Sequence, residues 1–302
     1  MELKLENPVK EKIINKESMV TLSAIQMEPI FGDKEANVAK TVMMIKEAAR
    51  KGANIITLPE LCNTGYMFNS REEVYKLAEA VPGGYTCNIW EQTAKECGVY
   101  IIAGITELDE DGISCYNTAV LFGPTEGYIG KHRKLHLWCD DKIFFEPGNL
   151  GYQVFNTKYG RIGMIICFDM WFAESFRILA LKGADVVCCP TNWVDTPPKE
   201  LRTMGTYFAM TNASANNIFV VAADRIGTER GCTFPGRSCI FGPEGWYRAG
   251  LASDDKEEIL VAEVNLMEAR RLNWNGMNVV HRDRRTDLYD EALGSGEYVL
   301  PR

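Results

Sequence analysis

The sequence lacks most of the features that mark metal, nucleic-acid and membrane proteins. Its 302 residues include three histidines and no C-x-x-C motif, which gives little basis for a zinc site. Lys and Arg number 33 against 41 Asp and Glu, for a net charge of -8, and no basic block occurs. This balance argues against nucleic acid or an anionic membrane as a partner. The longest apolar runs are shorter than the roughly 18 residues of a membrane span.

The first 16 residues are polar and charged, without the apolar segment of a secretory signal. We therefore expect a cytoplasmic protein in which residues 1–18 form a solvated extension. In a reducing compartment the ten cysteines should remain thiols rather than form a disulfide framework.

Short β-type stretches alternate along the chain with amphipathic helical ones, which indicates a layered α/β fold. Residues 37–51 place apolar side chains on one helical face, and Gly52 follows where a helix ends. The same patterns predict a helix over 89–97 and strands over 20–27, 54–58, 99–104, 114–122, 128–131 and 163–166.

Three phrases of the first half return in the second half in the same order. The pairs are KGANIITLPE (51–60) with KGADVVCCPT (182–191), GVYIIAG (98–104) with NIFVVAA (217–223), and SCYNTAVLFGP (114–124) with RSCIFGPEG (237–245). We expect two βαβ-type halves, related by an approximate two-fold axis, that share one core in a domain from 19 to 285. Residues 286–302 are expected to form a tail, of the kind that often packs on a neighbouring subunit.

One cysteine stands where a predicted strand ends. In GMIICFDMW (163–171), Cys167 closes an apolar run and is followed by a different pattern. A cysteine is often simply a small buried hydrophobe, but a strand end also holds a nucleophile rigidly at a cleft. A nucleophilic thiol needs a base and a group that stabilises an oxyanion. None of His132, His136 and His281 fits the role of base well.

Glu60 and Lys134 are stronger partners for the cysteine. Glu60 directly follows the strand 54–58, and strand ends at one edge of a layered sheet converge on one cleft. Lys134 lies in GKHRKLHLW (130–138), among apolar residues that imply partial burial. Taken singly, Glu60 could also be a turn acid, and the pattern does not separate a buried from a solvated Lys134. For Lys131 and Arg133 we favour a solvated face.

At these residues the chain resembles the nitrilase, or carbon–nitrogen hydrolase, superfamily. The resemblance rests on LPELCNTGY (58–66), GKHRKLHLW (130–138) and GMIICFDMWFAESFR (163–177), with support from FFEPGN (144–149). It extends over roughly residues 20–285, and it implies a four-layer αββα sandwich with internal pseudo-symmetry, which agrees with the repeated phrases.

The resemblance also implies roles for individual residues. Cys167 would attack the substrate carbon, and Glu60 would act as general base. Lys134 and the backbone N–H of Phe168 would stabilise the oxyanion, while Glu146 would help to position the substrate and Lys134. No metal or organic cofactor is implied. Members of the superfamily form dimers and larger assemblies, so a homodimer or larger homo-oligomer is expected.

The residues after the cysteine favour the amidase and carbamoylase branches. Phe168-Asp169 stands where true nitrilases usually have Trp-Glu, and Met170-Trp171 stands where hydrolases of N-carbamoyl-D-amino acids have paired arginines. The substrate-binding residues that we predict are Tyr66, Trp138, Phe168 and Trp193, while plain core packing is favoured for Trp171 and Phe172.

We therefore expect hydrolysis of a small, mostly apolar amide to a carboxylic acid and ammonia, through a thioester on Cys167. A ureido hydrolase and a nitrilase are alternatives within the same chemistry. Two further alternatives are an inactive sandwich that binds other proteins and an enzyme that transfers the acyl group to an amine.

Overall fold

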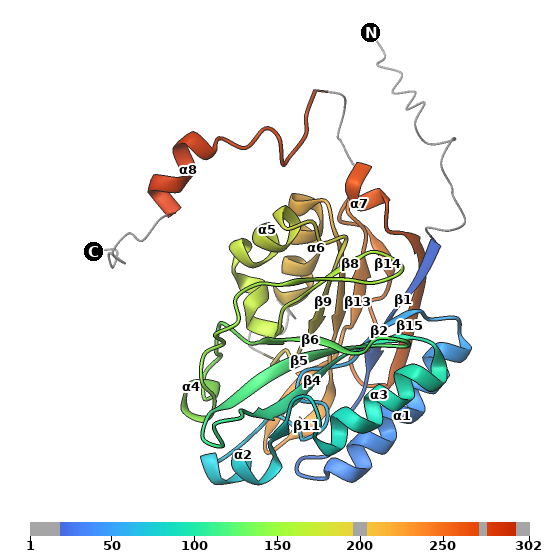
Figure 1. The fold of residues 1–302 in the computed structure, drawn as a ribbon, viewed down its shortest axis with the longest axis vertical. Helices are drawn as coiled ribbons and strands as arrows, with labels where there is room; N and C mark the ends of the chain where they lie inside the picture. The colour runs from blue at the N-terminus through green and yellow to red at the C-terminus, as the bar shows by residue number, and fades with distance from the viewer. Residues whose placement is uncertain (1–18, 196–203, 272–276, 294–302) are drawn as a thin grey trace.

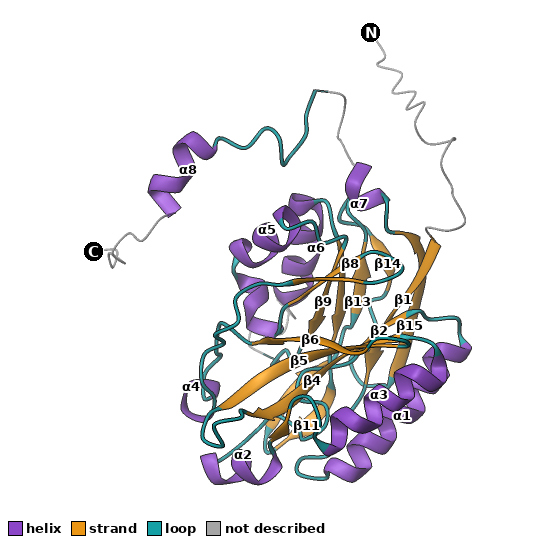
Figure 2. Cartoon of the chain, viewed as in Figure 1, coloured by secondary structure: helices purple, strands orange, loops and turns teal. Residues whose placement is uncertain are grey.

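Two β-sheets pack face to face and carry helices on their outer faces, as the ribbon of the computed structural model shows (Figures 1 and 2). The structure describes residues 19–195, 204–271 and 277–293. The predicted extension 1–18 and the end of the predicted tail, 294–302, lie outside these residues. The four-layer αββα sandwich expected from the sequence is confirmed.

The first sheet carries Glu60 and Lys134 just beyond the ends of two of its strands. Its strands are β1 (Met19–Gln26), β2 (Ile55–Thr57), β3 (Glu79–Ala80), β4 (Tyr100–Leu108), β5 (Cys115–Gly123), β6 (Gly127–Arg133) and β15 (Glu258–Asn265). They run in the order β15-β1-β2-β4-β5-β6, with β3 beside β4. Strands β1, β2 and β4 are parallel, and the outer pairs are antiparallel.

The second sheet repeats this plan. Its strands are β7 (Val154–Asn156), β8 (Arg161–Met164), β9 (Val186–Pro190), β10 (Phe219–Ala223), β13 (Cys239–Phe241) and β14 (Tyr247–Ala249). Read as β7-β8-β9-β10-β13-β14, the order matches the first sheet strand for strand, and each parallel or antiparallel pairing is the same. The repeat found in the sequence is therefore a repeat of sheet topology. A separate hairpin joins β11 (Ile226–Glu229) and β12 (Cys232–Pro235).

Helices cover both outer faces of the sandwich. Helices α1 and α3 lie on the first sheet, and α5 and α6 lie on the second (Figure 1). The helices are α1 (Lys34–Arg50), α2 (Arg71–Leu77), α3 (Tyr85–Cys97), α4 (Asp141–Phe144), the 3-10 helix η2 (Cys167–Trp171), α5 (Ala173–Leu181), α6 (Met204–Asn216), α7 (Glu268–Arg271) and α8 (Thr286–Leu293). Helix α8 lies outside the sandwich, although His281 before it bonds the Asn216 carbonyl at 3.0 Å.

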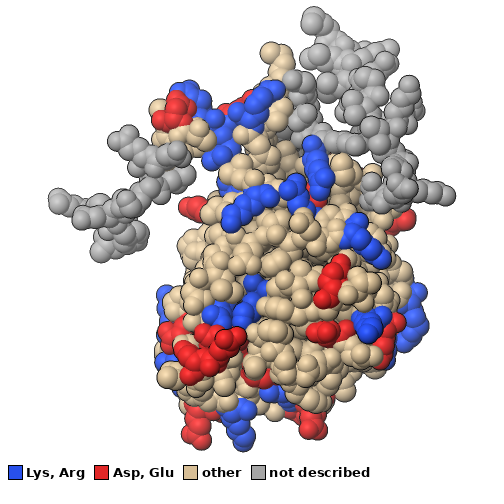
Figure 3. Space-filling model, viewed as in Figure 1, with Lys and Arg blue, Asp and Glu red and all other residues tan. Residues whose placement is uncertain are grey.

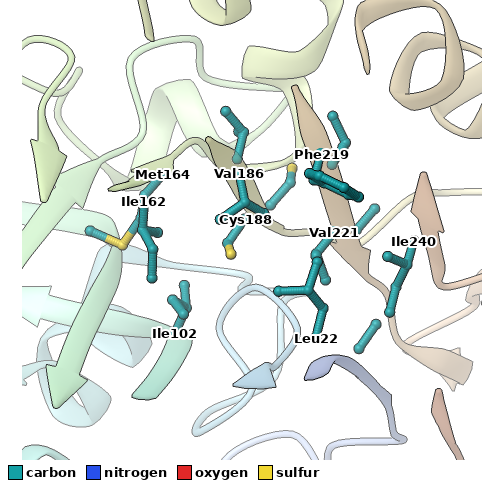
Figure 4. Close-up of a cluster of buried hydrophobic side chains, with 14 of the residues drawn as sticks. Leu22, Ile102, Ile162, Met164, Val186, Cys188, Phe219, Val221 and Ile240 are labelled. Carbon is teal, nitrogen blue, oxygen red and sulfur yellow. The ribbon is translucent and has the colours of Figure 1, made fainter. Parts of the chain in front are cut away.

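The core between the sheets is formed by aliphatic side chains that alternate along the strands. Leu22 and Ile102 of the first sheet point toward Ile162 and Val221 of the second (Figure 4). Each of these side chains is fully buried and contributes about 2 kcal/mol to folding by leaving water. This packing fixes the separation of the sheets, and with it the distance between the strand ends that carry the site.

The observed elements differ from the expected ones mainly at their ends. Helix α1 begins three residues early because Asp33 caps it, accepting a hydrogen bond from the Ala36 N–H at 3.0 Å. The expected strand 163–166 occurs as β8, which ends at Met164, two residues before the cysteine helix. Within the described residues, no helix is both long and apolar enough to cross a bilayer. Acidic and basic side chains lie beside each other over the lower part of the face in Figure 3.

Candidate active site

Glu60 lies in a tight turn directly after β2. Gly104 of β4 passes so close beneath this turn that a Cβ on it would collide with the backbone of Glu60 and Leu61. Two backbone hydrogen bonds hold the turn against β4. The Gly104 N–H donates to Pro59 O at 3.1 Å, and the Cys62 N–H donates to Gly104 O at 3.2 Å. Leu61 has a φ of +46°, which is strained for a branched residue. The backbone therefore fixes the direction in which Glu60 points.

The Glu60 carboxylate is completely buried and is bound through one oxygen. Its Oε1 accepts hydrogen bonds from Lys134 Nζ at 2.6 Å and from Asn117 Nδ2 at 2.7 Å. Its Oε2 has no hydrogen-bond partner among the described residues. One oxygen thus anchors the side chain, and the other is free to take a proton.

Lys134 reaches Glu60 because of the alternation of side chains along β6. Lys131 and Arg133 point to one face, where both bond the buried carboxylate of Glu107. The solvated-face interpretation of Lys131 and Arg133 is therefore wrong. His132 and Lys134 point to the other face, and the Lys134 side chain is fully buried.

A second carboxylate completes the surroundings of Lys134. Asp141, the first residue of α4, accepts a hydrogen bond from Lys134 Nζ at 2.6 Å through Oδ2 and is itself buried. The Lys134 ammonium thus lies between two carboxylates. Removing one partner of a buried ion pair generally costs 3–5 kcal/mol, so the cluster is expected to be rigid.

Glu146 does not have the position that the sequence predicted for it. Its carboxylate pairs with Arg71 at 3.0 Å, and 43 % of its side chain is exposed. The acid that holds Lys134 beside Glu60 is Asp141, five residues earlier. Glu146 follows the end of α4, and its backbone N–H bonds Cys115 O at 2.9 Å, which directs the chain away from Lys134.

Cys167 begins the short helix η2 with a left-handed backbone conformation, at a φ of +43°. A non-glycine residue in this region is strained, and such strain is frequent where a nucleophile is presented. The thiol lies close enough to Glu60 and Lys134 for both charges to act on its pKa. The structure therefore brings Glu60, Lys134 and Cys167 together, although they lie far apart in the sequence.

Asp169 holds the helix that carries Cys167. Its Oδ2 accepts hydrogen bonds from the Ile166 N–H at 3.1 Å and from His132 Nε2 at 2.9 Å. Its Oδ1 accepts them from the backbone N–H of His136 at 2.9 Å and from its Nδ1 at 2.7 Å. His132 and His136, which fit the role of base poorly, thus hold the cysteine turn against the end of β6.

The pKa values follow from burial and from these contacts. Burial raises the pKa of Glu60, and the Lys134 ammonium opposes this rise. Burial also raises the pKa of the Cys167 thiol; Glu60 adds to the rise and Lys134 opposes it. Burial alone would lower the pKa of Lys134, but Asp141 and Glu60 raise it well above its ordinary value. The resting site accordingly holds a protonated lysine and a protonated thiol.

A cavity of about 150 Å³ opens beside the Cys167 thiol. The residues that line it, mostly aromatic and apolar, are Trp138, Cys167, Phe168, Trp171, Asn192, Trp193, Val194, Met204 and Gly205. Asn192 is buried, and its Nδ2 donates to the Glu60 carbonyl at 2.9 Å. The cavity thus suits a small molecule with an apolar body.

Three of the four predicted substrate-binding residues, Trp138, Phe168 and Trp193, lie in the cavity wall. Tyr66 lies instead beneath the site, with its ring centroid 5.8 Å from Lys134 Nζ. Trp171 was expected in the core but lines the cavity. Met204 and Gly205, at the start of α6, are also in the wall, while residues 196–203 lie outside the described residues.

Similarity to known proteins identifies the family of this chain. The family model for carbon–nitrogen hydrolases matches residues 21–273. The chain belongs to the carbon–nitrogen hydrolase family. Relatives include a nitrilase of Pyrococcus abyssi, 43 % identical over 90 % of this chain and 99 % of the relative. An N-carbamoylputrescine amidase of Solanum lycopersicum is 36 % identical over 92 % of this chain and 96 % of the relative.

A solved structure extends the comparison to the fold of this carbon–nitrogen hydrolase. A carbon–nitrogen hydrolase from Helicobacter pylori G27 superposes with a TM-score of 0.81, at 28 % identity, over 92 % of this chain and 99 % of that one. The family resemblance seen in the sequence is therefore confirmed. The individual roles of Glu60, Lys134 and Cys167 stay predictions.

Four residues of the site were not predicted individually from the sequence: Asn117, Asp141, Asn192 and Gly205. Asn117 lies within β5, where a polar residue at a buried position was an available signal. Asp141 follows Lys134 by seven residues, and its neighbour Asp140 is equally acidic, so spacing alone did not single it out. Asn192 comes two residues after Pro190, the end of β9, where an asparagine would also suit an ordinary turn.

Proposed function

We propose that this enzyme hydrolyses the terminal carboxamide group, –CO–NH₂, of a small molecule with a mostly apolar body. The observation that carries the proposal is the state of Glu60, which is held through Oε1 by Lys134, is free at Oε2, and lies close enough to the Cys167 thiol for its charge to raise the pKa of that thiol. The cavity beside the thiol supports an apolar body, since aromatic side chains form most of its wall.

In the first half-reaction, Glu60 takes the thiol proton as the Cys167 sulfur attacks the carboxamide carbon. Base assistance is needed because the pKa of the buried thiol is raised, so little thiolate exists beforehand. The Lys134 ammonium and the backbone N–H of Phe168 stabilise the oxyanion. Glu60 then gives its proton to the nitrogen, the carbon–nitrogen bond breaks, and ammonia leaves a thioester on Cys167.

In the second half-reaction, the free oxygen of Glu60 takes a proton from water, and the resulting hydroxide attacks the thioester carbon. When the carbon–sulfur bond breaks, the carboxylic acid is released and the proton on Glu60 returns to the sulfur. Each turnover consumes one water and releases one ammonia, and the enzyme regains its starting protonation state.

A ureido substrate is the second candidate, and the N-carbamoylputrescine amidase of Solanum lycopersicum favours it. A ureido group also ends in –CO–NH₂, so the same attack releases ammonia, and the carbamic acid formed on hydrolysis breaks down to carbon dioxide and an amine. The nitrilase of Pyrococcus abyssi favours a nitrile as the third candidate.

The test is an ammonia-release screen over amides, ureido compounds and nitriles, with Cys167→Ala as the blank. Release from amides with no carbon dioxide supports the proposal, and equal release of ammonia and carbon dioxide from ureido compounds supports the second candidate. Signal from nitriles alone would overturn the amidase assignment. Absence of signal from all three classes would favour a binding protein.

We also propose a homodimer or a larger homo-oligomer. Ile178 and Leu181 of α5 and Tyr207 of α6 are large apolar side chains that are exposed on one outer layer of the sandwich. Exposed apolar groups on adjacent helices are the composition of a protein interface. Light scattering at the mass of a single chain, across the working concentration range, would refute this assembly.

A further inference from the structure

Trp193 forms part of the cavity wall, and its backbone is held on both sides. Its N–H donates to Asp224 Oδ1 at 3.0 Å, and Asp224 is fully buried after β10. The preceding Asn192 is tied to the Glu60 carbonyl at 2.9 Å, and the Asp195 N–H donates to Thr233 O at 2.9 Å. The main chain of Trp193 therefore has little freedom to move.

The indole ring, by contrast, is positioned by packing alone. Its Nε1 has no hydrogen-bond partner among the described residues, and only 3 % of the residue is exposed. The residue belongs to the core cluster that includes side chains of the second sheet and of α6. The empty volume next to the ring is the cavity that contains the Cys167 thiol.

Gly205 of α6 is the residue against which the ring edge rests. A Cβ on Gly205 would lie 2.6 Å from Cζ2 of Trp193 and closer still to its Cε2 and Nε1. Non-bonded carbon atoms prefer about 3.5–4.0 Å, so the ring lies where it does only because residue 205 has no side chain. With a side chain there, the ring would have to move by about 1 Å or more, and the core blocks the other directions.

We infer that the contact between Gly205 and Trp193 sets the size limit of the substrate pocket. Gly205 acts as a specificity-determining residue: it lets the indole lie back against α6 and so leaves room for the substrate body beside Cys167. The inference deepens the proposed function and rests on it for the substrate class, but the pocket size itself is measurable without turnover.

The first experiment measures the pocket directly through alkylation of Cys167. Wild type and Gly205→Ala are treated with iodoacetamide and with its longer N-butyl homologue, and labelling at Cys167 is quantified by peptide mass spectrometry. Exposed Cys139 serves as an internal reference for reagent strength. We expect Gly205→Ala to slow the N-butyl reagent about tenfold more than iodoacetamide, the usual effect of one methylene in a tight apolar pocket.

Trp193→Phe in the Gly205→Ala background is the matched control. Phenylalanine lacks the Nε1 and Cζ2 edge that meets the new methyl group, so the double variant should regain the wild-type ratio of the two rates. An unchanged ratio in Gly205→Ala, or no recovery in the double variant, would overturn the inference. Should Gly205→Ala fail to fold in a thermal melt, Trp193→Phe alone decides, with a relative gain for the longer reagent expected and no gain contradicting the inference.

The second experiment applies the same variants to a series of straight-chain amides. If wild type hydrolyses them, Gly205→Ala should lose kcat/KM progressively with chain length and spare the shortest, while a uniform loss contradicts the size limit. If wild type hydrolyses none, the proposed function fails, but the alkylation ratio still decides the size limit.

Discussion

The two halves of the molecule share one strand order, but the residues that follow their strands differ in chemistry. In the first half, β2 ends before Glu60, and β6 ends before Lys134. In the second half, β8 and the short segment after it lead to Cys167, and β9 leads to the cavity residues Asn192 and Trp193. The charged groups to which we assign proton transfer therefore come from one half, while the thiol and much of the apolar wall come from the other.

This difference shows what the packing of the sheets contributes to activity. The repeat supplies two similar edges, and only their apposition across the buried core places a carboxylate and an ammonium beside a sulfur. Neither half contains the whole cluster. The predicted reaction is thus a property of the interface between the halves.

The largest expected effect is from Glu60→Gln, which removes the proton acceptor of the first half. We expect kcat to fall about thousandfold, within the range for loss of a general base. Glu244→Gln, which removes a carboxylate that pairs with Arg248 on the surface of the second half, should cost less than tenfold. Steady-state ammonia release measures kcat for both variants. Comparable losses of kcat in the two would contradict the assignment of proton transfer to the first half.

The wild-type pH profile reports on the same residue. Because Glu60 must be ionised to accept a proton and burial raises its pKa, kcat/KM should fall with decreasing pH at values above the ordinary glutamate pKa of about 4.3. An acid limb at or below that value would argue against Glu60 as the base.

An intermediate effect is expected at Asp141. Variants of Asp141 and of Glu146 distinguish which of these two acids supports Lys134. Asp141→Asn should lower kcat about a hundredfold, since it frees the ammonium to shift from its place beside Glu60. Glu146→Gln should leave kcat unchanged, because its carboxylate pairs with Arg71 at the surface. The opposite ranking of the two variants would restore the role that the sequence suggested for Glu146.

The smallest effect concerns stability. It tests how strongly Asp169 of the second half binds His132 and His136 of the first half. Although burial opposes ionisation, hydrogen bonds from His132 and His136 keep the pKa of Asp169 well below its usual range. Such a group stabilises the fold above its unfolded pKa of about 3.9 and loses that contribution as the pH falls. Asp169→Asn should cost roughly 2 kcal/mol near pH 7, as for hydrogen bonds to a charged group.

Urea denaturation at several pH values measures this cost. The difference between wild type and Asp169→Asn should shrink as the pH falls below about 4, because the wild-type carboxylate then loses its advantage. A difference that stays constant across this range would mean that the contacts act through packing rather than through charge.

Much of the scaffold and part of the site were predictable from local patterns. Alternation and helical spacing located β1, α1 and β5 to within a few residues, because each buries one face along a continuous stretch. The positions of Glu60 and Cys167 followed from where strands end. Even their proximity could be expected, since strand ends of a layered fold meet at one edge.

The remaining errors concern contacts between segments that lie apart in the sequence, in strands and helices as well as in loops. Asp141 and Glu146 lie on either side of the single turn of α4, so their directions depend on how that turn is packed rather than on spacing. The role of Gly205 depends on an indole twelve residues away, and no local pattern encodes that contact. His132 and His136 looked unsuited to catalysis, which gave no indication that they hold Asp169.

Three turns of the site share a left-handed residue other than glycine: Leu61 after Glu60, Cys139 near Lys134, and Cys167 itself. Each such residue costs folding energy of order 1 kcal/mol. Selection for heat resistance would therefore favour glycine at the exposed position 139, but not at position 61, where the fully buried leucine side chain contributes more than the strain costs. The gain in melting temperature at position 139 would come with a less rigid turn beside Lys134, so that stability and turnover would oppose each other there.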